Sequence, residues 1–348
     1  MSSFGKIFKI TTFGESHGLG VGCIIENVPP RLKLSKEDIQ PQLDRRKPNQ
    51  NSLLSTRQEP DVVEIYSGLA DGVTLGTPLM LMVKNIDFKP LDYKSFSTTP
   101  RPGHADLTYL TKYGVKAASG GGRASARETV ARVAAGAVAE IYLKDCFKTH
   151  IVSWVSSVGD IQIPTDINML FIRDEKIDKS MVDLLGAFSI FNPCNLVENK
   201  KYLLISNNYT QRRFLIERNA NFIEEIVDEK IKLELSNNIN GGGGCRTDGD
   251  EIEICRDFLI LKFRFFENVN VRCPHVETAM RIILEIMSAK DDCDSIGGIV
   301  TCVIRNTPQS LGEPCFDKFE AELGKAMLSI PATKGFEIGS GFAGTKMR

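Results

Sequence analysis

A glycine-rich run that leads straight into a long amphipathic segment constrains the fold of this sequence more than any other feature. Apolar residues recur with a period near 3.6 across residues 126–143, which predicts one long helix. Residues 119–123 read Ser-Gly-Gly-Gly-Arg and approach its N-terminus, where unpaired backbone N–H groups and the helix dipole favour an anion. Arg123, Ser125 and Arg127 add donors there, and because cations at that end oppose the dipole, we expect a bound anion to compensate them. The spacing fits neither a Walker loop nor the dinucleotide fingerprint.

Apolar segments punctuated by glycine fill the first part of the chain. Their composition and turns predict strands at residues 7–13, 20–28, 62–66 and 78–84. A helix is expected to open after Ser35, with Asp38 as the capping partner three residues on. Pro41 lies inside this helix and is expected to kink or shorten it.

The composition changes after about Pro164. Residues 165–267 hold fewer small side chains and more Asn, Lys, Glu and Ile, so we expect a surface insertion that is locally disordered around residues 237–244. A compact character returns near Val271, and the later pattern predicts helices at 274–289 and 316–328 and a strand at 295–305.

Charge and cysteine usage narrow the class of protein. The net charge of −1 argues against a general nucleic-acid or membrane-surface binder. No window approaches the run of about 18 apolar residues of a transmembrane helix, and the N-terminal residues lack a secretory pattern. We therefore expect a cytoplasmic protein that binds neither nucleic acid nor membranes. Its nine cysteines include no C-x-x-C pair, which favours reduced, mostly buried thiols and no metal site.

The segment Gly-Glu-Ser-His-Gly at residues 14–18 has two interpretations. It can be a tight turn between strands, where small residues let the backbone bend sharply. It also matches the G-x-S-x-G nucleophile elbow of serine hydrolases around Ser16, but that elbow joins a strand to a helix and a strand is expected here. His17, exposed in such a turn, is a good acid–base candidate because imidazole titrates near neutrality.

Two further motifs carry basic residues. Asp-Arg-Arg at residues 44–46 can be a solvated helix end or part of a binding site. Arg-Pro-Gly-His at residues 101–104 predicts a turn that presents Arg101 and His104 from one loop. Taken together, these motifs predict a site for a small, multiply anionic substrate, in which arginines make bidentate contacts and two histidines move protons.

Four motifs in order and at matching spacing resemble the chorismate synthase family. They are FGESHGLGVGCIIENVPP, LDRRKPNQ, RPGHADLTY and GGGRASARETVARVAAG. Later segments, VRCPHVETAM, DSIGGIVTCVIRN and LGEPCFDKFEAELGKAMLSIPATKGFEIGSGF, are similar to the same family. The resemblance covers roughly residues 1–164 and 268–345, so residues 165–267 become a family-specific insertion within a single domain spanning 1–348.

The resemblance implies an α+β fold, a β-α-β sandwich with antiparallel sheets between helical layers, assembled as a homotetramer. It implies a lyase of aromatic amino acid biosynthesis in the shikimate pathway. That enzyme converts 5-enolpyruvylshikimate 3-phosphate to chorismate and phosphate by a 1,4-anti elimination. Reduced FMN is required, and the flavin lends electron density to the substrate transiently. Because no dinucleotide fingerprint is visible, reduced flavin is expected to come from outside the protein.

The resemblance also assigns roles to residues of this chain. His17 matches the catalytic histidine beside the substrate phosphate, and His104 the one that faces the pyrimidine edge of the flavin. Arg46 and Arg127 match arginines on the substrate side. Cofactor contacts are implied for Arg123, Ala124, Ser125, Pro331 and Ala332.

Three departures from the family pattern bear on activity. Ala124 stands where the family commonly has Ser, and Ser52 where it often has Arg. The family's Lys-Pro-Thr and Arg-x-Asp-Pro motifs do not occur, so we expect a C-terminally truncated member. A catalytically incomplete fragment that only binds anionic ligands is the leading alternative, and a serine hydrolase using Ser16 is a third.

Overall fold

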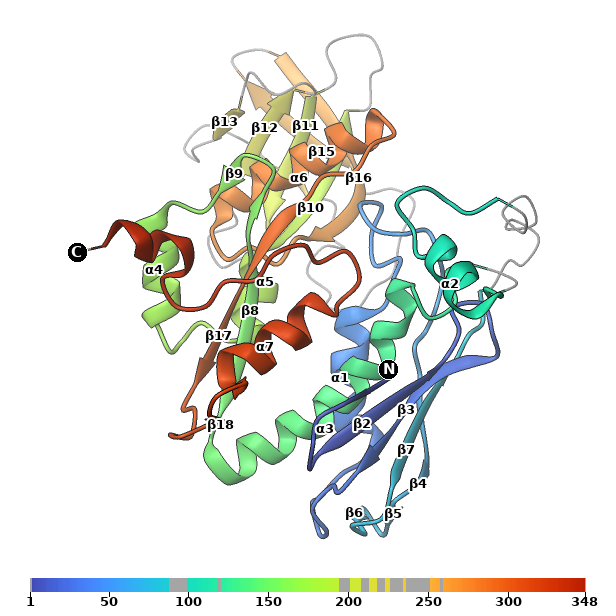
Figure 1. Ribbon diagram of the computed structural model, residues 1–348. Coiled ribbons are helices and arrows are strands. Elements are labelled where there is room, and N and C mark those ends of the chain that lie inside the picture. Colours follow the sequence, from blue (N-terminus) through green and yellow to red (C-terminus); the bar gives the residue numbers. More distant parts are fainter. Residues whose placement is uncertain are drawn as a thin grey trace. The chain divides into compact units, whose positions relative to one another are not determined.

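The computed structural model describes residues 2–87, 99–117, 120–193, 201–207, 213–217, 223–225, 234–235, 251–256 and 259–347 (Figure 1). The chain divides into two compact units. The first unit comprises Met1–Pro48, Arg57–His150 and Asn306–Arg348, and the second comprises Asn49–Thr56 and Ile151–Arg305. The segment at 237–244, expected to be disordered, lies outside the described residues.

An antiparallel five-stranded sheet forms the centre of the first unit. Its order is β1-β2-β3-β7-β4, and Cys23 of β3 lies opposite Leu81 of β7. Alternate residues of β7 are buried, namely Leu79, Leu81 and Val83, as expected for a strand with one face on the core. The bounds are β1 (Ser3–Phe4), β2 (Lys9–Gly14), β3 (Gly20–Glu26), β4 (Val63–Ser67) and β7 (Leu79–Lys84), with a small hairpin of β5 (Leu69–Ala70) and β6 (Val73–Thr74).

Two helices pack on this sheet and on each other. In Figure 1, α1 (Lys36–Arg46) and α3 (Thr129–Phe147) lie side by side next to the sheet strands. Helix α3 buries Ala131, Ala134 and Ala135 together with Val130 and Val138, and the small side chains let its backbone approach the strands closely. The expected capping box of Ser35 and Asp38 opens α1. This helix runs through Pro41 to Arg46, so the proline does not shorten it.

The long helix lies where the periodicity predicts it. It opens with a 3₁₀ turn, η2 (Ala126–Glu128), and α3 then continues four residues past the expected end, where Lys148 closes it in a left-handed conformation. The first unit also holds α2 (Asp106–Tyr113), a strand pair β18 (Gly312–Glu313) and β19 (Asp317–Lys318), α7 (Phe319–Leu328) and η3 (Gly341–Lys346).

Within the described residues, the second unit contains two sheets together with helices α4, α5 and α6. Its larger sheet has the order β13-β12-β11-β10-β16-β15-β14, and its smaller sheet the order β17-β8-β9. Phe188, Ile190 and Leu204, all within the range 165–267, are fully buried in the core of this unit beside Trp154.

The bounds of the second unit's elements are β8 (His150–Val158), β9 (Ile161–Gln162), α4 (Thr165–Arg173), α5 (Lys179–Leu185), β10 (Ala187–Pro193), β11 (Lys201–Ser206), β12 (Arg213–Glu217), β13 (Ile223–Glu225), β14 (Glu234–Leu235), β15 (Glu251–Arg256), β16 (Leu259–Asn270), α6 (Val276–Asp291) and β17 (Gly298–Arg305). Helices and antiparallel sheets together confirm the α+β class. None of the helices in the described ranges is both long and apolar enough to cross a bilayer.

Candidate active site

Both candidate histidines lie against one turn without side chains, residues 120–122, which we call the glycine turn. Gly120 has a φ of 64°, and a Cβ added there would come within 2.9 Å of Nε2 of His17. A Cβ on Gly121 would lie 3.1 Å from Nε2 of His104. The structure therefore brings together two residues that lie 87 positions apart, because only glycine leaves room for both rings.

Ser16 also lies against the glycine turn, but its surroundings are not those of a hydrolase nucleophile. Its backbone N–H donates to the carbonyl of Gly122 at 3.1 Å, and the side chain is 2% exposed. Among the described residues no hydrogen-bond partner reaches its hydroxyl. The turn joins β2 to β3 in a hairpin, so the strand-to-helix geometry of a nucleophile elbow is missing. A buried hydroxyl without a partner among the described residues, beside His17 at Gly120, points instead to a ligand group.

A buried carboxylate orients His104. Nδ1 of His104 lies 3.1 Å from Oδ1 of Asp106, which is 4% exposed. Arg101 donates from Nε to Oδ2 of Asp106 at 2.8 Å and from Nη2 to the Gly120 carbonyl at 3.1 Å. The hydrogen bonds from Arg101 hold the pKa of the Asp106 carboxyl well below its usual range, against the opposing effect of burial. Nδ1 of His104 also lies 3.3 Å from Nη2 of Arg101, which can only donate. We assign the proton to Nδ1 because the carboxylate oxygen is nearer and only accepts, and this assignment leaves Nε2 facing the glycine turn without the proton.

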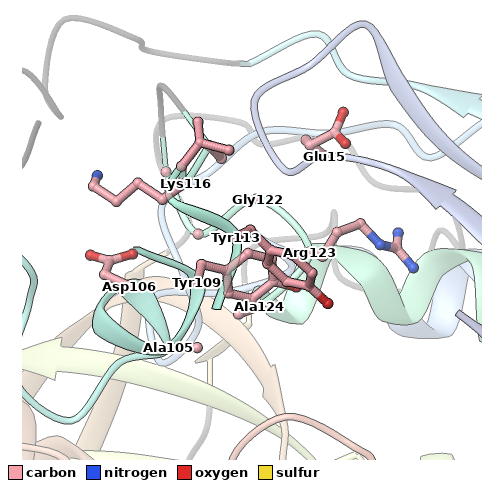
Figure 2. A pocket seen from close by; sticks show the side chains of 13 residues that line it. Glu15, Ala105, Asp106, Tyr109, Tyr113, Lys116, Gly122, Arg123 and Ala124 are labelled. Carbon is pink, nitrogen blue, oxygen red and sulfur yellow. The ribbon is translucent and has the colours of Figure 1, made fainter. Parts of the chain in front are cut away.

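Arg123 anchors the glycine turn to the sheet. It donates from Nη1 to the Gly14 carbonyl at 2.9 Å, and from Nη2 to Thr12 and to Glu128 at 3.2 Å. Figure 2 shows its guanidinium extending away from the neighbouring pocket. Ser125 caps η2 by accepting the N–H of Arg127 at 3.3 Å. The role of these residues and of Ala124 in binding a cofactor stays a prediction.

A network of five charged side chains lies next to the start of the long helix; we call it the arginine–carboxylate network. Arg46 and Arg127 both bond to Asp61, the former at 2.8 Å. Arg127 also lies 3.5 Å from Glu59, which Arg57 approaches at 2.7 Å. Burial lowers the pKa of the Arg46 guanidinium, and Asp61 opposes this shift. Asp61 and Glu59 thus place negative charge beside Arg127 from within the protein.

A pocket of about 210 Å³ opens beside the glycine turn (Figure 2). Tyr109 and Tyr113 of α2 line it, with ring centroids 5.6 Å apart. Glu15, Asp106 and Lys116 also contribute to its wall. Its lining is mostly apolar, so it offers a surface suited to a flat ring next to the Asp106–His104 pair.

Pro331 and Ala332 belong to the same unit but lie farther along the chain. They follow α7, where Pro331 is half-buried and Ala332 exposed with a φ of 66°. The described hydrogen bonds join this part of the chain to α3, through Arg132 and Ser329 at 2.6 Å. Their predicted contact with a cofactor stays a prediction.

Sequence reasoning missed three of the acidic residues that organise the site. Asp106 belongs to the RPGHADLTY motif, and its position two residues after His104 could have indicated that the carboxylate orients the imidazole. Glu59 and Asp61 flank a proline ahead of a strand, which gives no signal distinct from that of a surface turn. The helix α2 was also missed, because its short polar sequence follows a Pro-Gly turn.

The fold and the site define an α+β protein that holds two histidines and several arginines around one glycine turn, and comparison with known proteins agrees. A sequence model of the family described as chorismate synthase matches residues 8–190 and 220–348. The chorismate synthase of Schizosaccharomyces pombe is 44% identical over 347 residues, which is 100% of this chain and 71% of that protein. That of Toxoplasma gondii is 44% identical over 348 residues, 100% of this chain and 59% of that protein.

This chain therefore belongs to the chorismate synthase family, and the resemblance found in the motifs is confirmed. A solved structure titled "Crystal Structure of Chorismate Synthase" shares the fold with a TM-score of 0.60 at 24% identity, covering 97% of this chain and 70% of that one. The family match includes 165–190 and 220–267 of the range expected to be an insertion. The single-domain organisation with an insertion stays a prediction.

Proposed function

We propose that the protein to which this chain belongs catalyses the 1,4-anti elimination of phosphate from 5-enolpyruvylshikimate 3-phosphate to give chorismate, with reduced FMN as cofactor. The observation that carries this proposal is the meeting of His17 and His104 at one glycine turn. Family membership supports the same reaction. The proposal extends to a cytoplasmic homotetramer in the shikimate pathway.

His17 is the proposed acid for the departing phosphate. Its ring adjoins the buried hydroxyl of Ser16, and a general acid at a leaving group typically contributes about 10²–10⁴-fold to the rate. Arg46 is the proposed ligand for the anionic groups of the substrate, since its side chain is 18% exposed while keeping its charge beside Asp61. Arg127, on the same carboxylate, is proposed to complete the substrate side.

The residues present fit reduced FMN. The glycine turn lets both histidine rings lie against its backbone, and the pocket beside it has an aromatic wall from Tyr109 and Tyr113. His104 would hold the pyrimidine edge of the ring through Nε2, because Asp106 fixes Nδ1. When bound, reduced FMN would supply electron density to the substrate and recover it. The remaining proposed contacts come from Arg123, Ala124, Ser125, Pro331 and Ala332.

The chain's own groups then have three tasks. The arginines orient the substrate, and the buried surroundings of Ser16 and Asp106 exclude water from the reacting atoms. His17 holds a proton for the phosphate oxygen as the C–O bond breaks. His104, positioned by Asp106, keeps a nitrogen directed at the glycine turn.

An anaerobic assay tests the proposal. Dithionite-reduced FMN and the phosphorylated substrate are supplied, and chorismate absorbance is followed alongside a flavin titration. Chorismate formation supports the proposal, and light scattering of the same sample checks the tetramer. The second candidate function is binding of anionic ligands without catalysis, favoured by the several arginines at the site; substrate binding without chorismate would establish it.

A further inference from the structure

The arginine–carboxylate network has an order that bears on substrate binding. Each of its side chains contacts the next in space, so that positive and negative groups alternate in the order Arg46, Asp61, Arg127, Glu59 and Arg57. The side chains of the two carboxylates are 0% exposed and that of Arg127 is 2% exposed, whereas the two end arginines are each 18% exposed. The five charges are three positive and two negative, which sum to +1. The end arginines are the most exposed members of the network, so an anion reaches it most directly there.

We propose that Asp61 is a positioning residue for substrate binding, which fixes the guanidinium of Arg46 so that its remaining N–H groups meet the anionic substrate. The inference rests on the proposed function, since it deepens the role assigned there to Arg46.

Asp61 is held rigidly enough for this role. Its Oδ2 accepts from Nη1 of Arg46 at 2.8 Å, while its Oδ1 accepts from Arg127. Its backbone has a φ of 52°, an uncommon conformation for a residue with a side chain. Gln40 stabilises that conformation by donating from Nε2 to the Asp61 carbonyl at 3.1 Å and accepting the N–H of Val63 at 3.1 Å. The carboxylate therefore cannot follow Arg46 if the arginine moves.

Arg46 is left with donors for a ligand. A guanidinium has five N–H groups. The described residues take three of them, through Nε to Thr129 at 3.3 Å, Nη1 to Asp61 at 2.8 Å, and Nη2 to the Ala126 carbonyl at 3.2 Å. Five minus three leaves two, and their directions are set by the three bonds already made. Two fixed donors on one planar group suit a carboxylate or phosphate.

A double-mutant cycle in the full-length protein tests the proposal. Four proteins are compared, namely the wild type, Asp61→Asn, Arg46→Met and the variant with both changes. The dissociation constant for 5-enolpyruvylshikimate 3-phosphate is measured by calorimetry, and KM and kcat are measured anaerobically with reduced FMN. If Asp61 acts through Arg46, Asp61→Asn weakens binding about 10-fold in the wild type but only about twofold when Arg46 is already methionine.

The expected signature is a split between the kinetic constants. KM is expected to rise by about the same factor as the dissociation constant, while kcat changes by less than about threefold. Asp61→Glu, which restores a carboxylate, is expected to recover part of the affinity. The matched control is Glu26→Gln, which converts an exposed carboxylate 3.4 Å from Lys9 to an amide and is expected to leave both constants unchanged.

An equal loss of affinity from Asp61→Asn in both backgrounds, or no loss in either, would overturn the proposal. If Asp61→Asn does not fold in a thermal melt, Gln40→Ala replaces it, because this change loosens the Asp61 backbone and keeps the carboxylate. Gln40→Ala is then expected to weaken binding several-fold only where Arg46 is present. A wild type that binds the substrate but forms no chorismate would defeat the proposed reaction alone, and the binding cycle would still decide the role of Asp61.

Discussion

Replacing Asp106 by asparagine perturbs His104 without altering the imidazole ring. The carboxylate accepts Nδ1 of His104 at 3.1 Å, and Nε and Nη2 of Arg101 at 2.8 and 3.1 Å. An amide of the same shape carries no charge and has an acceptor at only one of the two oxygen positions. If its oxygen keeps the hydrogen bond from Nε of Arg101 at the Oδ2 position, its NH2 group occupies the Oδ1 position and faces Nδ1 of His104, which can then no longer donate to it. In Asp106→Asn the imidazole is therefore expected to lose its fixed tautomer while the surrounding fold remains.

The cost in stability follows from burial and from the partners. Asp106 is 4% exposed, but the Arg101 side chain is 21% exposed and regains water when the pair is broken. A hydrogen bond to a charged group contributes about 1.5–3 kcal/mol, so Asp106→Asn is expected to lower the free energy of unfolding by about 2 kcal/mol at neutral pH.

The pH dependence of that loss has a definite sign. Hydrogen bonds from Arg101 hold the pKa of Asp106 below its unfolded value, which is about 3.9. The carboxylate therefore contributes its full stabilisation above about pH 4, and loses it as the pH falls through the lower folded pKa. The difference in melting temperature between wild type and Asp106→Asn is expected to be constant near neutrality and to shrink below about pH 4.

Activity supplies the decisive assay. If Nε2 of His104 contacts the flavin as proposed, Asp106→Asn is expected to lower kcat by about 10²–10⁴-fold with little change in KM for the substrate. Nitrogen chemical shifts of the labelled imidazole report the tautomer directly, and Glu26→Gln again serves as the control. A kcat within about threefold of the wild type, with the tautomer of His104 changed, would refute the reasoning.

Two further predictions concern the glycine turn and its histidines. His17→Ala and His104→Ala are each expected to slow turnover by about 10²–10⁴-fold while weakening substrate binding far less, measured anaerobically with reduced FMN; turnover close to wild type would remove that histidine from the mechanism. Gly120→Ala is expected to lower kcat strongly, because its Cβ would come within 2.9 Å of Nε2 of His17 at a φ of 64°. Gly136→Ala is the matched control: no atom lies within 4 Å of its added Cβ, and helix propensity favours alanine, so equal losses in both variants would contradict the packing argument.

Local patterns in the sequence were sufficient for the framework of the first unit. The helix at 126–143 was predictable because a period of about 3.6 is a property of neighbouring residues, and only its extension to Phe147 was missed. The capping box at Ser35 was predictable for the same reason. The motif histidines could be named, because small residues around His17 and His104 indicate exposed turns in any fold.

Partners distant in the chain were beyond the reach of such patterns. Arg127 and Asp61 lie 66 positions apart in the chain. From the sequence, Arg127 at a helix N-terminus predicts a neighbouring negative charge, but it does not show which residue or ligand carries that charge. The burial of Phe188 and Leu204, which lie within residues 165–267, in the core of the second unit was likewise not predictable from composition. Burial in a sheet depends on which strands pair, and composition does not record pairing.

The balance of the reaction tests the central claim most directly. The full-length protein is incubated anaerobically with reduced FMN and excess 5-enolpyruvylshikimate 3-phosphate, and chorismate, inorganic phosphate and flavin redox state are measured on one sample. The account predicts chorismate and phosphate in equal amounts, over many turnovers, with the flavin still reduced at the end. Phosphate released without chorismate, or flavin oxidised in proportion to product, would contradict the proposed elimination at this site.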